Sequence, residues 1–300
     1  MTTSTGNGDG TKVAVLGVGI MGSGMATNLL AAGLQTTVWD RSSGATTTIS
    51  RAGGHVADSP REAVRGAQVA ITMLPTAAIV NSVVFDGNVT EDFAPHAVWA
   101  QMGTIGVEET LDFVRRLAEL RSDVMFIDAP VSGSKGPAEK GELLILASGP
   151  AQAASIVERA FGAIGRRTVW LGDAGQGSRM KLVVNSYLSI LIEGVAETLA
   201  LSERLGIDSE ALNAAIEGGP LDAPLADAKL HKMEQGDYAP EFPLEWALKD
   251  VDLALEIGGH DALPLLASLS RQWHIAVDTG HAREDVSAAR LALEPKPKTP

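Results

Sequence analysis

The sequence predicts an α/β fold in which a doubly wound parallel sheet is followed by an all-α domain, the two being linked by a long helix. Two observations predict this arrangement. Before residue 173, short apolar runs of strand length alternate with helix-length segments, and beyond residue 175 only helical patterns remain. Alternating strands and helices are typical of a parallel sheet with helices on both faces, because each helix connects two parallel strands.

Seven short apolar runs, each bounded by turn residues, are predicted as buried strands. They cover residues 13–17, 35–40, 68–74, 97–102, 124–129, 142–149 and 167–173. Five longer segments with helical periodicity follow, at residues 175–205, 209–217, 223–235, 244–258 and 263–279. We therefore expect a sheet domain over residues 12–173 and a helical domain over residues 174–294. The Gly/Thr/Ser-rich lead, residues 1–11, is predicted to be disordered, and the tail 294–300 to be solvated.

Composition excludes several classes of function. The net charge of −13 argues against a nucleic-acid partner or an anionic membrane surface. The chain has no cysteine, which excludes disulfides and thiolate catalysis, and the six histidines lack paired metal-ligand spacing, so no metal is expected. The N-terminus lacks the features of a signal peptide, and no apolar run reaches the roughly 20 residues that span a bilayer. We expect a soluble, cytoplasmic protein.

The glycines of "VAVLGVGIMGSGMATNLLAAG" predict a dinucleotide site. Gly17, Gly19 and Gly22 have the G-x-G-x-x-G spacing, with a strand before them and a helix after them. In this Rossmann arrangement the glycines permit a tight turn, close approach of the pyrophosphate, and close packing of helix on strand. The helix N-terminus, with Ile20 and Met21, then offers unpaired N–H groups to the phosphates.

The end of the second strand bears on the choice between NAD and NADP. Asp40 stands where a ribose-binding acid is expected, and a carboxylate there accepts from both ribose hydroxyls and repels a 2′-phosphate. Arg41 and Ser42 follow it, and an arginine can clasp that phosphate. The two influences oppose each other, so both cofactors remain open, with a weak preference expected for NAD.

Two polar residues interrupt the apolar stretch "GSRMKLVVNSYLSILI". Lys181 and Asn185 are four residues apart and therefore share one helix face, while leucine, valine and isoleucine cover the other directions. A partly desolvated lysine can exchange a proton near neutral pH, which a hydride transfer to a carbonyl requires. The alternative is a lysine whose side chain extends along the helix end into solvent. Helix chemistry alone leaves the two readings open.

Four motifs in order resemble the β-hydroxyacid dehydrogenase family. Its members include 3-hydroxyisobutyrate dehydrogenases and glyoxylate/succinic semialdehyde reductases, and its fold is 6-phosphogluconate dehydrogenase-like. The motifs are "GVGIMGSGMATNLLAAG", "DAPVSGSKGPAEKGELLILASG", "GQGSRMKLVVN" and "FPLEWALKDVDLAL". The resemblance covers residues 12–293, and the second and third motifs look most like the glyoxylate/succinic semialdehyde reductase branch. It implies an NAD(P)-dependent enzyme that transfers a hydride between nicotinamide and a small β-hydroxy acid or its aldehyde partner, with a carboxylate-bearing substrate.

The resemblance also implies roles for individual residues. Lys181 matches the catalytic lysine and Asn185 its partner. The residues expected to contact the cofactor, besides the glycine motif, are Leu74, Pro75, Thr104 and Lys249. Those expected to contact the substrate are Ser132, Gly133, Ser134, Phe242 and Asp250. The family's small domains associate, so a homodimer or larger homo-oligomer is expected, with the apolar helix in the contact.

Some positions depart from the family pattern. Asp40-Arg41-Ser42 replaces a sequence that suits NADP, Gly103-Thr104 lacks one hydroxyl of a Ser-Thr pair, and Trp246 replaces a smaller or polar residue. Two other functions share the fold, namely an imine reductase and a non-catalytic NAD(P)-binding protein. The intact Lys181–Asn185 pair argues against both. The natural substrate, oligomer size and physiological direction of reaction stay open.

Overall fold

The computed structural model describes residues 10–293, so residues 1–9 of the expected disordered lead and the tail 294–300 lie outside the described residues. By its internal contacts the chain divides into two compact units, the first ending at Lys181 and the second beginning at Leu182. The division falls inside one long helix. The domain limits expected from sequence, 12–173 and 174–294, remain a prediction.

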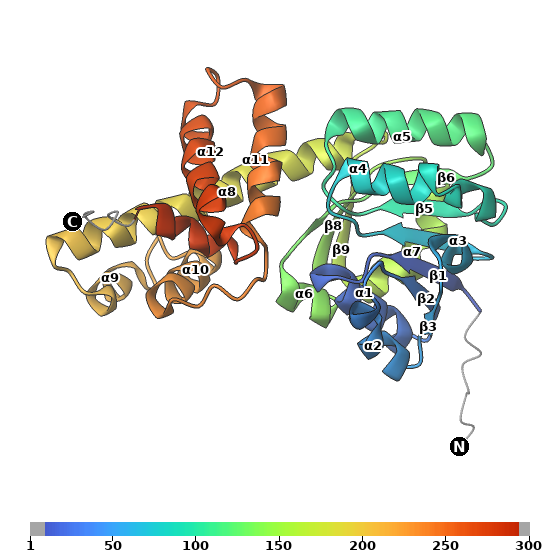
Figure 1. Ribbon diagram of the computed structural model, residues 1–300, viewed down its shortest axis with the longest axis horizontal. Coiled ribbons are helices and arrows are strands. Elements are labelled where there is room, and N and C mark those ends of the chain that lie inside the picture. Colours follow the sequence, from blue (N-terminus) through green and yellow to red (C-terminus); the bar gives the residue numbers. More distant parts are fainter. Residues whose placement is uncertain (1–9, 294–300) are drawn as a thin grey trace. The chain divides into compact units, whose positions relative to one another are not determined.

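The first unit is built on a six-stranded, wholly parallel sheet (Figure 1). Its strand order is β3-β2-β1-β4-β5-β6, so the direction of winding reverses between β1 and β4. The strands are β1 (Lys12–Leu16), β2 (Gln35–Trp39), β3 (His55–Val56), β4 (Val69–Thr72), β5 (Val98–Gln101) and β6 (Met125–Asp128). Ligands of such sheets bind beyond the carboxyl ends of the strands at this reversal.

Strand side chains alternate between two cores. Val13 and Val15 of β1 pack into one cluster and Ala14 and Leu16 into the other, all essentially inaccessible to water. The first core contains α1 (Ile20–Ala31), α2 (Ser43–Arg51) and α7 (Ala153–Ile164). The second contains α3 (Pro60–Val64), α4 (Ala77–Val80) and α5 (Val107–Leu120), which lie across the sheet from α1 and α2 in Figure 1. The doubly wound arrangement expected from sequence is confirmed.

The structure differs from the sequence expectation at two short strands and at the last two long ones. β3 and β7 (Val131–Ser132) have two residues each, too few to leave a periodic pattern. β8 (Leu143–Ala147) and β9 (Gly165–Trp170) do not extend the main sheet, but form a second sheet in the order β7-β8-β9. The reason is local: Asp128 and Ser148 exchange antiparallel backbone bonds of 2.9 and 2.7 Å, so the returning chain crosses β6 at a single bridge.

The second unit is helical, as expected. It contains most of α8 (Gln176–Leu205), together with α9 (Ser209–Ile216), α10 (Pro224–Gln235), α11 (Leu244–Gly258) and α12 (Pro264–Ala276) (Figure 1). The final segment, Val286–Leu293, is a 3-10 helix that packs against α10, α11 and α12. The fully buried Trp273 of α12 donates from its indole nitrogen to Glu193 of α8 at 2.7 Å.

By length and composition alone, α8 could cross a membrane, since it has 30 residues and an apolar window of mean hydropathy 1.3. The core helix of a globular domain passes the same test. One face of α8 is both polar and buried, with Asn185, Ser189 and Glu193 at intervals of four residues. Two of these side chains bond to α11 and α12 of the same unit. This is the pattern of a helix packed inside protein.

The buried carboxyl of Glu193 predicts a pH-dependent stability. Burial raises the pKa of Glu193 from its ordinary value of 4.5 to about 7, although the bond from Trp273 opposes the shift and Glu197 adds to it. The folded state therefore keeps a proton that the unfolded chain releases, and stability falls as pH rises from 4.5 to 7. Between pH 5.5 and 8 the loss is about 2 kcal/mol.

Glu193→Gln removes this titration and still accepts from Trp273. We expect its urea-unfolding free energy, relative to wild type, to increase by about 2 kcal/mol between pH 5.5 and 8. Glu197→Gln, on an exposed position of the same helix, is the matched control and should leave most of the dependence in place. An identical pH dependence in wild type and Glu193→Gln would assign the loss of stability to other groups.

Candidate active site

The carboxyl ends of the parallel strands bring together most of the residues predicted in the first unit. Gly17 follows β1, Asp40 follows β2, Leu74 and Pro75 lie just beyond β4, Thr104 lies beyond β5, and Ser132 lies beyond β6. Because all these strands run in the same direction, their following loops lie at one edge of the sheet. This edge includes the reversal between β1 and β4, where nucleotides bind in related topologies.

The three glycines of the first loop have different reasons for being glycine. Gly17 has φ +96°, and a Cβ on it would lie 2.5 Å from the Met73 carbonyl oxygen. A Cβ on Gly22 would overlap the carbonyl oxygen of Gly17. Gly19 has an ordinary φ of −69°, and a Cβ there would meet no protein atom within 4 Å. No atom of residues 10–293 requires a glycine at position 19, so the turn leaves room there for a bound group.

The N-terminus of α1 fits an anionic group. Gly19 is its N-cap residue, and no side chain caps the helix. The backbone N–H groups of Ile20, Met21 and Gly22 stand in its first turn, where an α-helix supplies no acceptor. Such a terminus, joined to an open glycine, is suited to a pyrophosphate.

The carboxylate of Asp40 accepts hydrogen bonds from two nearby backbone N–H groups. Its Oδ2 accepts from the Val18 N–H at 2.9 Å, and its Oδ1 accepts from the Ser42 N–H at 2.8 Å. Arg41 and Ser42 are exposed, and Ser42 is the N-cap of α2 without a side-chain bond to that helix. Each carboxylate oxygen keeps a further lone pair for a ribose hydroxyl, and the hydroxyl of Ser42 is not used as a cap.

The ends of β4 and β5 are fixed by a buried hydrogen-bonded chain. Trp99 donates to the Thr72 hydroxyl at 2.9 Å, Thr72 donates to Gln101 at 2.8 Å, and Gln101 donates to the Gly103 carbonyl at 2.7 Å. The backbone of Leu74 passes so close that a Cβ at Gly103 would overlap its carbonyl oxygen. The missing hydroxyl at position 103 therefore has a steric reason in this chain. Thr104 is not the cap of the following helix, whose N-cap is Gly106.

The loop predicted to hold a carboxylate follows β7. Ser132 ends that strand and is partly buried, Gly133 has φ +134°, and Ser134 is the N-cap of α6 (Lys135–Lys140) without a side-chain bond to it. A Cβ at Gly133 would lie 2.9 Å from Leu143 and 3.0 Å from Pro137, so only glycine fits this turn. Ser132 and Ser134 therefore stand on either side of a position that only glycine can occupy.

Asp128, which the sequence analysis did not single out, holds the start of α8. It is the last residue of β6 and is 1% exposed. Its carboxylate accepts from the Ser178 hydroxyl and the Ser178 N–H, both at 2.7 Å, from the Gly175 N–H at 3.1 Å and from the Ser148 hydroxyl at 3.1 Å. Burial raises the pKa of Asp128, and these four donors oppose that shift. The signal in the sequence was an acid at the end of a buried strand.

The glycines before Lys181 are required by the same contact. Gly175 has φ +97°, and a Cβ at Gly177 would lie 2.8 Å from the Asp128 carbonyl oxygen. Lys181 lies one turn beyond Ser178 and is 8% exposed. Its side chain is thus buried rather than extended into solvent, which favours the first of the two readings that the sequence left open.

In the second unit, Asn185 and Asp250 are directly bonded. The Asn185 amide donates to Asp250 Oδ2 at 2.5 Å, and Lys249 donates to Asp250 Oδ1 at 2.6 Å. Asn185 and Asp250 are almost completely buried. The acceptor Asp250 orients the amide, and the Asn185 Oδ1 is buried with no hydrogen-bond partner among residues 10–293. Buried polar atoms usually have a partner, so this oxygen of a fixed amide is a candidate acceptor for a bound molecule.

Phe242 lies just before α11, and its side chain is partly buried. Among residues 10–293, no group of three or more histidine, aspartate or glutamate side chains could hold a metal ion.

Comparisons with known proteins agree with this geometry. The NAD-binding domain of 6-phosphogluconate dehydrogenase matches residues 12–172, and the NAD-binding domain of NADP-dependent 3-hydroxyisobutyrate dehydrogenase matches residues 175–293. The chain is 34% identical to glyoxylate/succinic semialdehyde reductase 1 of Arabidopsis thaliana, over 94% of this chain and 98% of the relative. The chain belongs to the β-hydroxyacid dehydrogenase family.

Two further proteins widen the family comparison. L-threonate dehydrogenase of Cupriavidus necator is 32% identical, over 92% of this chain and 94% of the relative. The crystal structure of a 3-hydroxyisobutyrate dehydrogenase from Salmonella typhimurium has a TM-score of 0.87 at 26% identity, over 93% of this chain and 99% of that one. As a β-hydroxyacid dehydrogenase, the protein is an NAD(P)-dependent oxidoreductase, as the sequence predicted.

The different reasons for Gly19 and Gly22 give a matched pair of variants. Gly22→Ala forces a Cβ into the Gly17 carbonyl and should lower the free energy of unfolding by about 1–3 kcal/mol. Gly19→Ala has room and an allowed φ, so it should leave stability unchanged while weakening NADH binding about tenfold. Urea unfolding and a fluorescence titration with NADH measure the two effects. Unchanged NADH binding in Gly19→Ala would show that the cofactor phosphates do not bind at this turn.

Proposed function

We propose that this β-hydroxyacid dehydrogenase reduces small aldehyde or keto acids to hydroxy acids and catalyses the reverse oxidation. The observation that carries the proposal is the pairing of the buried Lys181 with Asn185, one turn apart on α8, where Asn185 presents an orphaned acceptor. The names of the Arabidopsis and Cupriavidus relatives support this substrate class, since both act on small acids or semialdehydes. Glyoxylate and succinic semialdehyde are the first substrates to test.

Lys181 is proposed as the general acid in reduction and the general base in oxidation. The nicotinamide, when bound, supplies or accepts the hydride. The carbonyl oxygen that gains negative charge takes a proton from Nζ of Lys181, and the alcohol returns it in the reverse direction. Lys181 is buried, and the Asp128 contacts hold the helix turn from which its side chain extends.

Asn185 is proposed to orient the reacting group. One of its N–H bonds is committed to Asp250, so its Oδ1 and its second N–H remain for the substrate. The orientation set by Asp250 adds an acceptor, which suits the hydroxyl of the alcohol form of the substrate.

The remaining assignments follow the family resemblance and the edge of the sheet. Ser132, Gly133 and Ser134 would hold the substrate carboxylate through hydroxyl and N–H groups, and Thr104 would stand near the nicotinamide. Leu74 and Pro75 would contact the cofactor ribose. In the second unit, Lys249 would contact the cofactor, while Asp250 and Phe242 would form part of the substrate pocket.

Cofactor use is proposed to be dual, with a weak preference for NADH. Asp40 retains lone pairs for the ribose diol, while Arg41 and Ser42 are exposed and the Ser42 hydroxyl makes no cap bond to α2. With NADP, the carboxylate cannot turn away freely, because its two oxygens also hold Val18 and Ser42. This constraint favours NAD, and Arg41 offsets it by attracting the 2′-phosphate.

We also propose that the protein forms a homodimer or a larger assembly through the helical unit, and that it is cytoplasmic. Val183, Tyr187, Leu201 and Leu205 of α8 are large apolar side chains that are between 57% and 67% exposed. Exposed apolar patches of this kind mark association surfaces in soluble proteins.

Lys181→Ala tests the proton-transfer assignment. We expect kcat for glyoxylate reduction to fall about 10²–10⁴-fold, because general acid catalysis is lost. The dissociation constant of NADH should hardly change. Arg179→Ala, an exposed position on the same helix, is the matched control and should keep wild-type turnover. Near-normal kcat in Lys181→Ala would remove the lysine from the mechanism.

Asp40 and Arg41 test the cofactor account. Arg41→Ala should lower kcat/KM for NADPH about 10- to 150-fold while changing that for NADH little, because a charged phosphate contact is worth about 1.5–3 kcal/mol. Asp40→Asn should raise kcat/KM for NADPH. Arg51→Ala, exposed at the far end of α2, should change neither cofactor. An equal effect of Arg41→Ala on both cofactors would contradict a 2′-phosphate role.

A further inference from the structure

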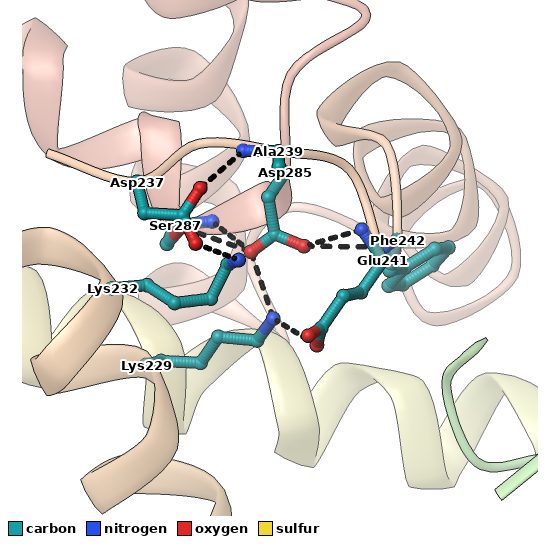
Figure 2. Close-up of polar contacts among 8 residues, drawn as sticks. All are labelled: Lys229, Lys232, Asp237, Ala239, Glu241, Phe242, Asp285 and Ser287. Carbon is teal, nitrogen blue, oxygen red and sulfur yellow. Dashed lines mark hydrogen bonds and ion pairs between the residues drawn. The ribbon is translucent and has the colours of Figure 1, made fainter. Parts of the chain in front are cut away.

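A further buried carboxylate, Asp285, has no part in the proposed reaction, yet its two oxygens accept five hydrogen bonds from other residues of the helical unit. It is fully buried, and Figure 2 shows its carboxylate among the donors. One oxygen, Oδ1, accepts from Lys229 Nζ at 2.8 Å, from the Ser287 hydroxyl at 2.9 Å and from the Ser287 N–H at 3.2 Å. The other, Oδ2, accepts from the backbone N–H groups of Glu241 at 3.1 Å and Phe242 at 3.2 Å.

The backbone around Asp285 reinforces this contact. Its own N–H donates to the Tyr238 carbonyl at 2.9 Å, and the Val286 N–H donates to the Phe242 carbonyl at 2.8 Å. In the opposite direction, the N–H of Leu244 donates to the backbone carbonyl of Glu284 at 2.9 Å. The segment around Asp285 therefore pairs in antiparallel fashion with the chain at Pro243, just before α11 begins.

The charge of Asp285 is compensated inside the protein. Burial by itself would raise the pKa of Asp285, but the ion pair with Lys229 and the backbone donors outweigh it and lower the pKa. Lys229 is itself 4% exposed and also lies 3.4 Å from Glu241. A buried ion pair is a poor source of stability by itself, because desolvation cancels most of the attraction. The geometry of the turn is set instead by the bonds from the N–H groups of Glu241 and Phe242 to Asp285 Oδ2.

We propose that Asp285 is a positioning residue for the pocket wall. It holds the turn at Glu241 and Phe242, so that the Phe242 ring and the start of α11 take one fixed place. The ring is only partly buried, so its position depends on the backbone that carries it. Six residues into α11, Asp250 in turn orients Asn185. The inference rests on the proposed pocket roles of Phe242 and Asp250.

Two variants separate positioning from mere stabilisation. Asp285→Asn keeps one acceptor oxygen, which should face the Lys229 cation and the two Ser287 donors. Its amide nitrogen then meets the N–H groups of Glu241 and Phe242, which lose their acceptor. Lys229→Met removes the cation but leaves the carboxylate and all four of its bonds to Glu241, Phe242 and Ser287. Both variants break the ion pair and should lower Tm. Only Asp285→Asn releases the turn.

Amide hydrogen exchange tests the anchor without any substrate. In Asp285→Asn, the N–H groups of Phe242 and Leu244 should exchange at least about tenfold faster than in Lys229→Met, since they lose a direct or adjacent bond. Exchange should remain unchanged at Val15 in the first unit. Equal exchange at Phe242 and Leu244 in the two variants would overturn the proposal.

Kinetics test the consequence for the pocket. Asp285→Asn should raise the KM for glyoxylate about tenfold with a smaller change in kcat, whereas Lys229→Met should change KM less than about threefold. NADH binding should be normal in both. Phe242→Ala is the reference: if it raises KM and Asp285→Asn does not, the positioning role is wrong. Absence of any Lys181-dependent reduction would refute the proposed function instead, and the exchange rates would still decide the anchor.

Discussion

The carboxylate of Asp128 is the contact on which the first half of the candidate site depends. It ends a buried strand and receives four hydrogen bonds, three of them from the turn at Gly175 and Ser178 that begins α8. Removing such a charge from water is costly unless every oxygen is satisfied, and the donors accomplish this. The result is that α8 begins at one place relative to the sheet edge where the dinucleotide is expected.

This contact gives a physical reason for two motifs that lie far apart in the sequence. "DAPVSG" contributes the acceptor, and "GQGSRMK" contributes the donors, the left-handed Gly175 and the close approach at Gly177. Lys181 then follows one turn later on a rigid helix. Catalytic groups held on regular elements keep their geometry better than groups on loops. The serine loop after β7 belongs to the same stretch of chain, so the acceptor for α8 and the proposed carboxylate site are built together.

The helical unit repeats the principle with different residues. Asp250 receives bonds from Asn185 and Lys249, and Asp285 receives bonds from Lys229 and from the turn at Phe242. Each acid is buried, and each joins segments more than 40 residues apart in sequence. Apolar packing alone tolerates small shifts, whereas a buried charge tolerates few, because a misplaced donor leaves it unsatisfied. Polar contacts of this kind therefore define the positions of the side chains proposed to carry the chemistry.

The sequence by itself determined the α/β class, five of the six strands of the main sheet, the helices of the second half and the glycine turn. These features follow from hydrophobic period and local turn chemistry, which a few neighbouring residues specify. It also pointed to Lys181 and Asn185, because polar residues on an apolar helix are conspicuous. Only the tertiary structure decided that β8 and β9 leave the main sheet, that Lys181 is buried and that Asp250 turns the amide of Asn185. It alone revealed Asp128 and Asp285, since the donors that satisfy a buried carboxylate come from distant segments, and no local pattern records which segments meet.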